Sequence, residues 1–190
     1  TFKVVPGTTL LLHAAAGGVG LIACQWAKYL GATVIGTVGS DEKAELACSH
    51  GCDHAILYRK EDFVTRVREI TDGEGVDVVY DSVGKDTFLK SLASLDRRGY
   101  LVLYGRASGP VDPINPEIFN PGSKFLTRPS LIDHTATRKE LMWRAGDVLD
   151  WIGSGKMNLR IGHEFPLSEA AEAHRQLEGR ATTGKVLLLV

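Results

Sequence analysis

The sequence predicts an α/β protein built on a doubly wound, parallel sheet of six strands. Along the first 130 residues, short apolar runs of strand length alternate with stretches of helical length, and Gly or Asp-Gly separates them. The short runs are apolar throughout, which is typical of strands buried on both faces. Strands that alternate with helices need crossover connections, so they pair in parallel and the helices cover both faces of the sheet.

The first half of the sheet follows from three such runs. A strand over residues 10–13 precedes a helix over about 18–30, which Gly31 ends. The second strand, residues 33–38, is rich in β-branched residues, and Ser40 then caps a helix that ends at Gly51. A short third strand, residues 54–57, precedes residues 62–70, where apolar side chains recur at helical spacing.

The second half repeats the alternation and then changes. It contains a strand over residues 76–80, a helix over 86–95, a strand over 100–104 and a sixth strand over 125–127. Beyond residue 130 the pattern predicts two amphipathic helices, 138–152 and 168–177, and a final strand over 185–190. We therefore expect two units, one over residues 1–130 and one over residues 131–190.

Composition excludes several classes of protein. The chain has 190 residues, 44% of them hydrophobic, and its 22 Lys and Arg nearly balance its 23 Asp and Glu, which predicts a globular protein without an electrostatic footprint for nucleic acid or an anionic membrane. No apolar run or leader directs the chain to a membrane, and three cysteines are too few for a disulfide framework, so we expect a cytoplasmic protein. The chain opens without Met and reads like part of a longer one.

The strongest motif is HAAAGGVG, residues 13–20, which lies between the first strand and the first helix. Compared with GxGxxG, it has Ala15 in place of the first Gly and keeps Gly17 and Gly20. In such motifs the glycines let the backbone approach a pyrophosphate and let the helix pack on the strand, while the first amides of the helix face the anion. We predict a dinucleotide site here, and hence a Rossmann fold.

The end of the second strand predicts which dinucleotide. NAD-specific sites usually hold an acidic residue there for the ribose hydroxyls, but this chain has Gly39 and Ser40. Ser40 offers a hydroxyl donor and Lys43 a cation one turn into the helix, so we predict NADP(H). The alternative is that Asp41, Glu42 and Lys43 form only the solvated first turn of a helix.

The sequence shows no catalytic constellation. Tyr58-Arg59 and the polar loops 81–84 and 105–109 follow predicted strands at the same edge of the sheet, where they suit a cofactor. The six His residues are scattered, so each is expected to have a surface or hydrogen-bonded structural role, and no GxSxG motif surrounds a serine. Cys48 and Cys52 make at most half of a zinc site, so no metal is predicted.

Several motifs together resemble one family over essentially the whole chain. They are HAAAGGVGLIACQWAKYLGA, VGSDEK, YRKEDF, VVYDSVG, LDRRG, TRPSL and GRATTGK. This set is similar to the zinc-independent, zeta-crystallin-like NADPH:quinone oxidoreductases of the medium-chain dehydrogenase/reductase superfamily. YDSVG followed by TRPSL is far more specific than the glycine motif.

The resemblance implies site residues in three groups. The pyrophosphate loop, together with Gly20 of the glycine motif, comprises Ala16, Gly17, Gly18, Val19 and Gly20. The 2′-phosphate and adenosine contacts would be Gly39, Ser40, Lys43, Tyr58 and Arg180. The neighbours of the ribose and nicotinamide would be Ser82, Tyr104, Gly105, Arg106, Thr127, Arg128 and Pro129.

The resemblance also implies an activity and an architecture. The activity is reduction of quinones or related enones by NADPH, without zinc. Residues 131–190 would be the return segment of a GroES-like catalytic domain whose opening part precedes Thr1, and the sixth strand would pair sheets across a homodimer. Two alternatives stay open: a nucleotide-binding or redox-sensing module without turnover, and the enoyl reductase domain of a polyketide synthase.

Overall fold

The computed structural model describes residues 1–190 and confirms the predicted parallel sheet. The six strands lie in the order β3-β2-β1-β4-β5-β6, and every neighbouring pair is parallel. Their bounds are β1 Thr9–His13, β2 Thr33–Val38, β3 His54–Leu57, β4 Val76–Asp81, β5 Leu95–Leu103 and β6 Phe125–Thr127. The order reverses between β1 and β4, so the cleft beside their carboxyl ends is where ligands bind in open α/β sheets.

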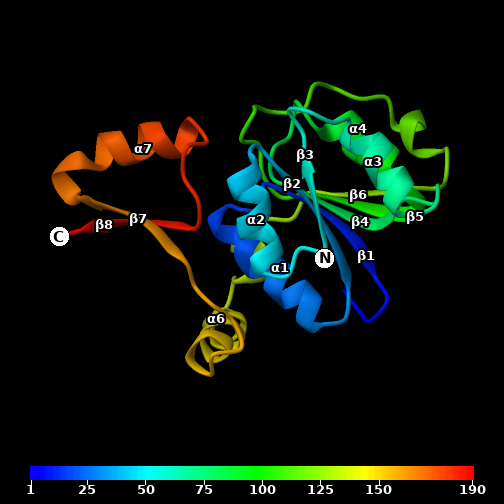
Figure 1. The fold of residues 1–190 in the computed structure, drawn as a ribbon. Coiled ribbons are helices and arrows are strands. Elements are labelled where there is room, and N and C mark those ends of the chain that lie inside the picture. Colours follow the sequence, from blue (N-terminus) through cyan, green and yellow to red (C-terminus); the bar gives the residue numbers. More distant parts are fainter.

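Helices cover both faces of this sheet (Figure 1). Helices α1, Gly18–Tyr29, and α2, Asp41–Ser49, pack on one face through small side chains such as Cys24, Ala27 and Ala47. Helices α3, Phe63–Ile70, and α4, Phe88–Ser94, pack on the other face through bulkier side chains that include Phe63 and Phe88. The strands are buried between the two helical layers, so residues on both of their faces are apolar, as the continuous apolar runs of the sequence predicted.

Local signals fix the ends of these helices. The Asp62 carboxylate accepts hydrogen bonds from the amides of Val64 and Thr65 at the start of α3, and the Ser40 hydroxyl accepts one from the Lys43 amide at the start of α2. Gly31 follows α1 with φ +81°, a left-handed conformation that glycine adopts without steric penalty.

The structure corrects several predicted bounds, among them those of α4 and β5. Helix α4 begins at Phe88 instead of 86, because Thr87 turns its hydroxyl onto the Asp81 carboxylate. Strand β5 begins at Leu95 instead of 100: Val76 pairs with Leu95 and Val78 with Tyr100, so residues 96–99 form a bulge. The polar sequence of this bulge predicted a loop, but its neighbours on both sides pair with β4.

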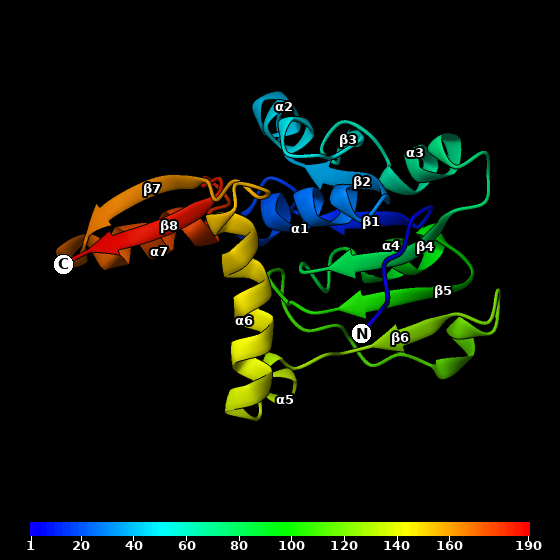
Figure 2. The ribbon, with the colours of Figure 1, turned by 90° about the horizontal axis from the view of Figure 1, so that it is seen from below.

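Beyond β6 the chain leaves the sheet (Figure 2). Short helices lie at Pro116–Phe119 and α5, Leu131–His134, followed by α6, Arg138–Gly153. Next come β7, Ile161–Pro166, a 3₁₀ turn at Leu167–Glu169, α7, Ala170–Glu178, and β8, Lys185–Leu189. β7 and β8 pair in parallel as a separate two-stranded sheet. Strand β7 was not predicted, because its residues alternate only weakly between apolar and polar.

Helix α6 differs from the prediction in its burial. Its periodicity predicts an apolar face, but no residue of the helix is buried, and Leu141 and Leu149 are 46% and 65% exposed. Contact with α1 comes from its end, where the Trp151 ring lies 5.2 Å from that of Trp26 and 4.5 Å from that of Tyr29. None of the helices in residues 1–190 has the length and apolar character to cross a membrane.

Candidate functional site

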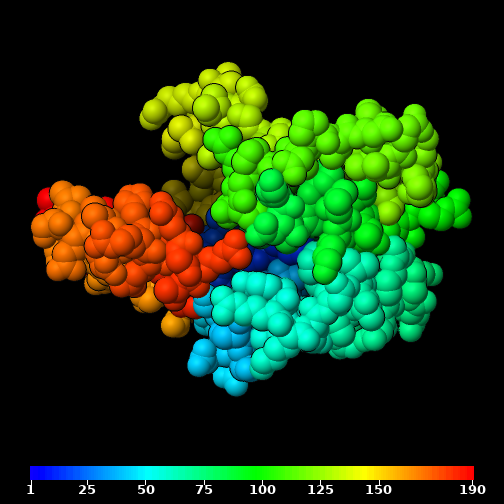
Figure 3. All heavy atoms as spheres, turned by 90° about the horizontal axis from the view of Figure 1, so that it is seen from above, coloured from blue at the N-terminus to red at the C-terminus, as the bar shows by residue number.

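A cleft of about 510 Å³ lies at the carboxyl ends of β1, β2 and β4. In Figure 3, blue atoms of the first strand and its loop lie at the bottom of this hollow, between cyan and green atoms, with the orange C-terminal segment beside them. Most of the lining comes from the loops after these three strands, from the loop after β3, and from the loop between α7 and β8. Single residues of α2, α3, α4 and the segment after β5 add to it: Lys43, Phe63, Lys90 and Ala107. The volume falls within the range of small-molecule sites.

The glycine-rich loop forms one wall of the cleft. Ala14 turns the chain with φ +56°, and Ala16 and Gly17 face the cleft. A Cβ at Gly20 would lie only 2.3 Å from the carbonyl oxygen of Ala14, so the helix packs directly on the turn. No side chain caps α1 at Gly17. The first N–H groups of a helix lack intrahelical partners, so this end can receive an anion.

A second wall gathers hydroxyl groups and cations. Gly39, Ser40, Lys43, Tyr58 and Arg180 all line the cleft. The Lys43 ammonium donates a hydrogen bond of 2.6 Å to the carbonyl oxygen of Arg180. A Cβ at Gly39 would lie 3.1 Å from the Tyr58 hydroxyl, so glycine here gives that ring its room. Residues from the loop after β2, from α2, from the loop after β3 and from the loop after α7 thus meet at one wall of the cleft.

Four acidic residues lie near this wall, and only two of them line the cleft. Glu42 accepts a 3.2 Å hydrogen bond from the Ser40 hydroxyl and Asp41 pairs with Lys60 at 2.7 Å, and neither lines the cleft. Two carboxylates do line it: Glu61, which pairs with Arg66 at 3.0 Å, and Asp86, 3.8 Å from Arg180. At the end of β2, where an NAD site holds its acid, the structure has none.

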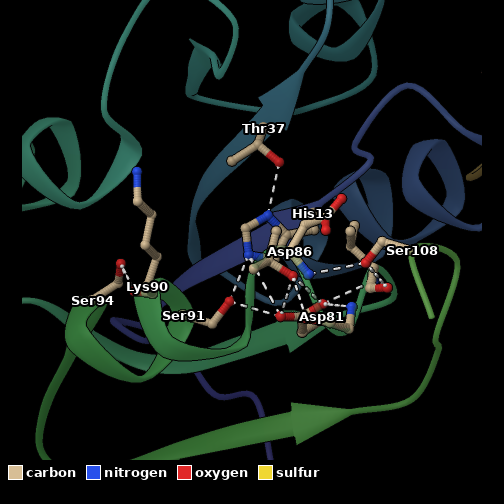
Figure 4. A network of polar contacts seen from close by, with 11 residues as sticks. His13, Thr37, Asp81, Asp86, Lys90, Ser91, Ser94 and Ser108 are labelled. Carbon is tan, nitrogen blue, oxygen red and sulfur yellow. Dashed lines mark hydrogen bonds and ion pairs between the residues drawn. The ribbon is translucent and has the colours of Figure 1, made fainter. Parts of the chain in front are cut away.

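A buried chain of hydrogen bonds lies beneath the cleft (Figure 4). The Asp81 carboxylate is fully buried and accepts hydrogen bonds from the amides of Val83, at 2.8 Å, and Gly84, at 3.0 Å. It also accepts from the hydroxyls of Thr87 and Ser91, each at 2.7 Å. These four donors replace the hydrogen bonds to water that the carboxylate loses on burial, as burial of a charged group requires.

Ser91 connects this carboxylate to His13. Since the Ser91 hydroxyl donates to Asp81, it accepts from His13 Nε2 at 2.8 Å, which places the ring proton on Nε2. Nδ1 then accepts from the Thr37 hydroxyl at 2.9 Å. Burial lowers the pKa of His13, and the nearby Asp81 opposes this in part. The histidine is therefore neutral and held in one tautomer.

The structure brings together only part of the predicted site. The predicted residues that line the cleft are Ala16, Gly17, Gly39, Ser40, Lys43, Tyr58, Ser82 and Arg180. Those that lie outside it are Gly18, Val19 and Gly20 in the first turn of α1, Tyr104, Gly105 and Arg106 after β5, and Thr127, Arg128 and Pro129 at the end of β6. The Arg128 guanidinium donates to the carbonyl oxygen of Leu103 at 2.9 Å, which ties this segment to β5.

The cleft also contains polar residues that the sequence did not predict, among them Thr37, Glu61, Asp86, Thr87 and Lys90, and His13 was predicted only as the first residue of the glycine motif. Every His was expected to be structural or exposed, and the buried, hydrogen-bonded His13 agrees with that expectation. One signal was available: His13, Thr37 and Asp81 are polar residues that end three apolar strands.

Comparison with known proteins identifies the family. The family model described as zinc-binding dehydrogenase matches residues 18–152. The chain belongs to the zinc-binding dehydrogenase family. Among residues 1–190, no group of three or more His, Cys, Asp or Glu side chains could hold a metal ion. The expectation that this family member needs no zinc stays a prediction.

Individual members of the family are close in sequence and structure. The quinone oxidoreductase of Salmonella typhimurium is 51% identical over 192 residues, which cover 100% of this chain and 59% of that protein. The 2-haloacrylate reductase of a Burkholderia species is 49% identical over 191 residues, 100% of this chain and 57% of that protein. The structure of Escherichia coli quinone oxidoreductase complexed with NADPH matches with a TM-score of 0.96 at 47% identity, covering 100% of this chain and 59% of the other. These matches confirm the predicted fold and the resemblance to quinone oxidoreductases, and the chain spans less than two thirds of each relative's length.

Proposed function

We propose that this chain is the NADP(H)-binding part of an oxidoreductase that reduces quinones or related enones. The observation that carries the proposal is the wall formed by Ser40, Lys43, Tyr58 and Arg180: Gly39 and Ser40 follow β2 where an NAD site would place its acid, and neither Asp41 nor Glu42 lines the cleft. A carboxylate at this point would repel a 2′-phosphate, whereas hydroxyl and cationic groups stabilise one. The NADPH in the matching Escherichia coli structure supports the same cofactor.

The cofactor contacts follow from this placement. The 2′-phosphate and adenosine would bind Gly39, Ser40, Lys43, Tyr58 and Arg180, and the pyrophosphate would bind the start of α1, at Ala16, Gly17, Gly18, Val19 and Gly20. The nicotinamide half would pass Ser82 at the edge of the cleft and extend toward the segments after β5 and β6, with Tyr104, Gly105, Arg106, Thr127 and Arg128 as its neighbours. A Cβ at Gly105 would lie 2.3 Å from the Ser82 carbonyl oxygen, so these two loops are already in contact.

When bound, NADPH supplies the hydride, and the residues of this chain bind and orient it. Two acceptor classes have support. Quinones are named for the relatives from Salmonella typhimurium and Escherichia coli, and a 2-haloacrylate is named for the Burkholderia relative, which is 49% identical. Neither the motifs nor the cleft single out an acid or a base, and quinone reduction needs none from a side chain, so we assign no catalytic residue.

We propose that residues 1–130 form the cofactor domain and that residues 131–190 belong to a second, catalytic domain. The exposed apolar side chains of α6 and the greater length of the relatives support this division. We further propose a homodimer that pairs its sheets through β6, an edge strand whose Phe125 and Leu126 are exposed. The three free cysteines agree with a cytoplasmic location.

Titration of the full-length protein with NADPH and NADH, followed by nucleotide fluorescence, tests the cofactor. We expect tighter binding of NADPH, and we expect Lys43→Ala to weaken NADPH binding by about tenfold while leaving NADH unchanged, because a charge-assisted hydrogen bond to phosphate is lost. Lys60→Ala is the matched control, since Lys60 is exposed, pairs with Asp41 and lies outside the cleft. Equal affinity for both nucleotides in the wild-type protein would refute the specificity.

An assay of NADPH oxidation by the full-length protein tests the reaction. A simple quinone and a 2-haloacrylate, supplied separately, distinguish the two acceptor classes. Turnover of either one supports the oxidoreductase proposal. NADPH binding without turnover of quinones, enones or haloacrylates would instead support a nucleotide-binding module.

A further inference from the structure

The buried chain of hydrogen bonds consists of Thr37, His13, Ser91 and Asp81. Three of these residues lie at the ends of strands, within two residues of a loop that lines the cleft. His13 ends β1 and precedes the glycine-rich loop, and Thr37 is followed by the last residue of β2 and then Gly39 and Ser40. Asp81 ends β4 and precedes Ser82 and Val83, which also line the cleft. The side chains that connect these three strands thus lie at the base of the loops that would hold a cofactor.

The chain of bonds is continuous and directional. The Thr37 hydroxyl donates to His13 Nδ1, His13 Nε2 donates to the Ser91 hydroxyl, and Ser91 donates to Asp81 Oδ2. The other carboxylate oxygen, Oδ1, accepts the amides of Val83 and Gly84, so the last bonds fix the backbone of the loop itself. Every member is buried. Loss of one link therefore leaves a polar group unpaired away from water.

The ring of His13 has no freedom to compensate. It packs edge-on against Phe63, with ring centroids 5.0 Å apart, and its Nε2 lies 4.0 Å from Asp81 Oδ2. The ring therefore acts as a rigid spacer of fixed length between β2 and α4.

We propose that His13 and Asp81 are positioning residues, which hold the three cleft loops in one arrangement through Thr37 and Ser91. That this arrangement serves NADPH binding rests on the proposed function. His13 and Asp81 act through the loops and not on the reacting atoms, so their effect falls on affinity and on loop order.

Ser91→Ala in the full-length protein tests the proposal, with Ser94→Ala as the matched control. Both serines are fully buried on α4, but the Ser94 hydroxyl bonds only to the Lys90 carbonyl oxygen in its own helix, at 2.9 Å (Figure 4). We expect Ser91→Ala to raise the Kd for NADPH by about tenfold, because it unpairs the His13 N–H, and to speed hydrogen–deuterium exchange in the segment that contains Val83 and Gly84. Ser94→Ala should change neither measurement.

A second pair of variants covers the case in which Ser91→Ala fails to fold. Thr37→Val keeps the shape of the side chain and removes the donor to His13, whereas Thr37→Ser restores the hydroxyl. We expect the valine variant to reproduce both effects and the serine variant to recover wild-type values, as a positioning role requires.

The two measurements separate this proposal from the proposed function. Equal loop exchange in Ser91→Ala and Ser94→Ala would overturn the positioning role, whether or not nucleotide binds. Faster loop exchange with an unchanged Kd would overturn its link to the cofactor. Wild-type protein that binds no NADPH would refute the proposed function, and loop exchange would still decide the role of His13 and Asp81.

Discussion

At the scale of single residues, His13 links stability to pH. Burial lowers its pKa below the ordinary 6.5, and the nearby Asp81 opposes that shift in part. In the unfolded chain the imidazole takes up its proton as the pH falls through about 6.5, while the folded protein still excludes it. The unfolded state is therefore favoured in this window. Above it both states are neutral, and the full stability is present.

We expect the free energy of unfolding to fall between pH 7 and pH 5, and to fall less steeply in His13→Gln. Urea denaturation of the full-length protein at the two pH values measures this difference. His54→Gln is the control, because His54 is exposed and its replacement should keep the wild-type slope. If His13→Gln retains the wild-type slope, the histidine is not buried in the neutral form.

The cysteines give a second prediction at this scale. Cys24 and Cys52 are buried in one core cluster, whereas Cys48 is exposed. The Cys24 and Cys52 thiols contact backbone carbonyl oxygens inside the core, so reagent cannot reach them without unfolding. Because access decides which thiol reacts here, we expect iodoacetamide to label only Cys48 among these residues in the native protein, as read by peptide mass spectrometry. Urea should expose all three, and rapid native labelling of Cys24 would contradict the packing.

At the scale of elements, the close contact between α1 and its preceding turn depends on Gly20. A Cβ at this position would lie 2.3 Å from the Ala14 and 2.5 Å from the Ala15 carbonyl oxygen, and both are backbone atoms that cannot move aside independently. We expect Gly20→Ala to destabilise the protein by about 3 kcal/mol, in the range of severe overpacking, and to weaken NADPH binding. Thermal unfolding followed by circular dichroism measures the change.

Gly146→Ala is the matched control for this substitution. Gly146 lies inside α6, where an added Cβ would meet no atom within 4 Å. Alanine should stabilise the helix by about 0.5–1 kcal/mol, because glycine loses more backbone entropy on folding. A similar loss of stability in both variants would show that the α1 turn is not specially crowded.

Gly20 and Gly18 show how far the contacts of an element could be predicted from the sequence. The role of Gly20 is local, so a strand, a glycine motif and a helix in succession were enough to predict it. Gly18 is different: a Cβ there would lie 2.9 Å from the Gly184 carbonyl oxygen, a contact between the two ends of the chain. Strand β7 escaped prediction for the same reason, because its pairing with β8 and not its own pattern makes it a strand.

At the scale of the whole molecule, the order of the strands decides which residues form the site. His13 and Thr37 are 24 residues apart, and His13 and Ser91 are 78 apart. Their contact requires β1 to lie between β2 and β4, which strand periodicity does not specify. The convergence of the loops was predictable, because parallel strands present their carboxyl ends at one edge. Arg180 was predicted as a site residue only through the family resemblance. The sequence pattern of residues 131–190 did not indicate that this segment returns to the cleft.

Arg180 makes the cleft depend on how the C-terminal segment is held. Asn158, between α6 and β7, exchanges two hydrogen bonds with Gln25 of α1, at 3.0 and 2.7 Å. Trp151, near the end of α6, packs on Trp26 and Tyr29 of α1. Farther along, Gly184 donates to the Ala16 carbonyl oxygen at 3.2 Å, directly behind the glycine-rich loop. The contacts of Trp151 with Trp26 and Tyr29 thus help to fix the position of the chain between α6 and the loop that holds Arg180.

We expect Trp151→Ala to weaken NADPH binding several-fold, although Trp151 does not line the cleft, because truncation of a partly buried aromatic contact frees the segment that delivers Arg180. Proteolysis within residues 179–184 should accelerate in parallel. Trp143→Ala is the control, since Trp143 lies on the same helix, is 62% exposed and contacts only its neighbour Arg144 among charged groups. If both variants of the full-length protein bind NADPH equally well, Arg180 is held by the loop between α7 and β8 itself, and the placement of α6 has no influence on the site.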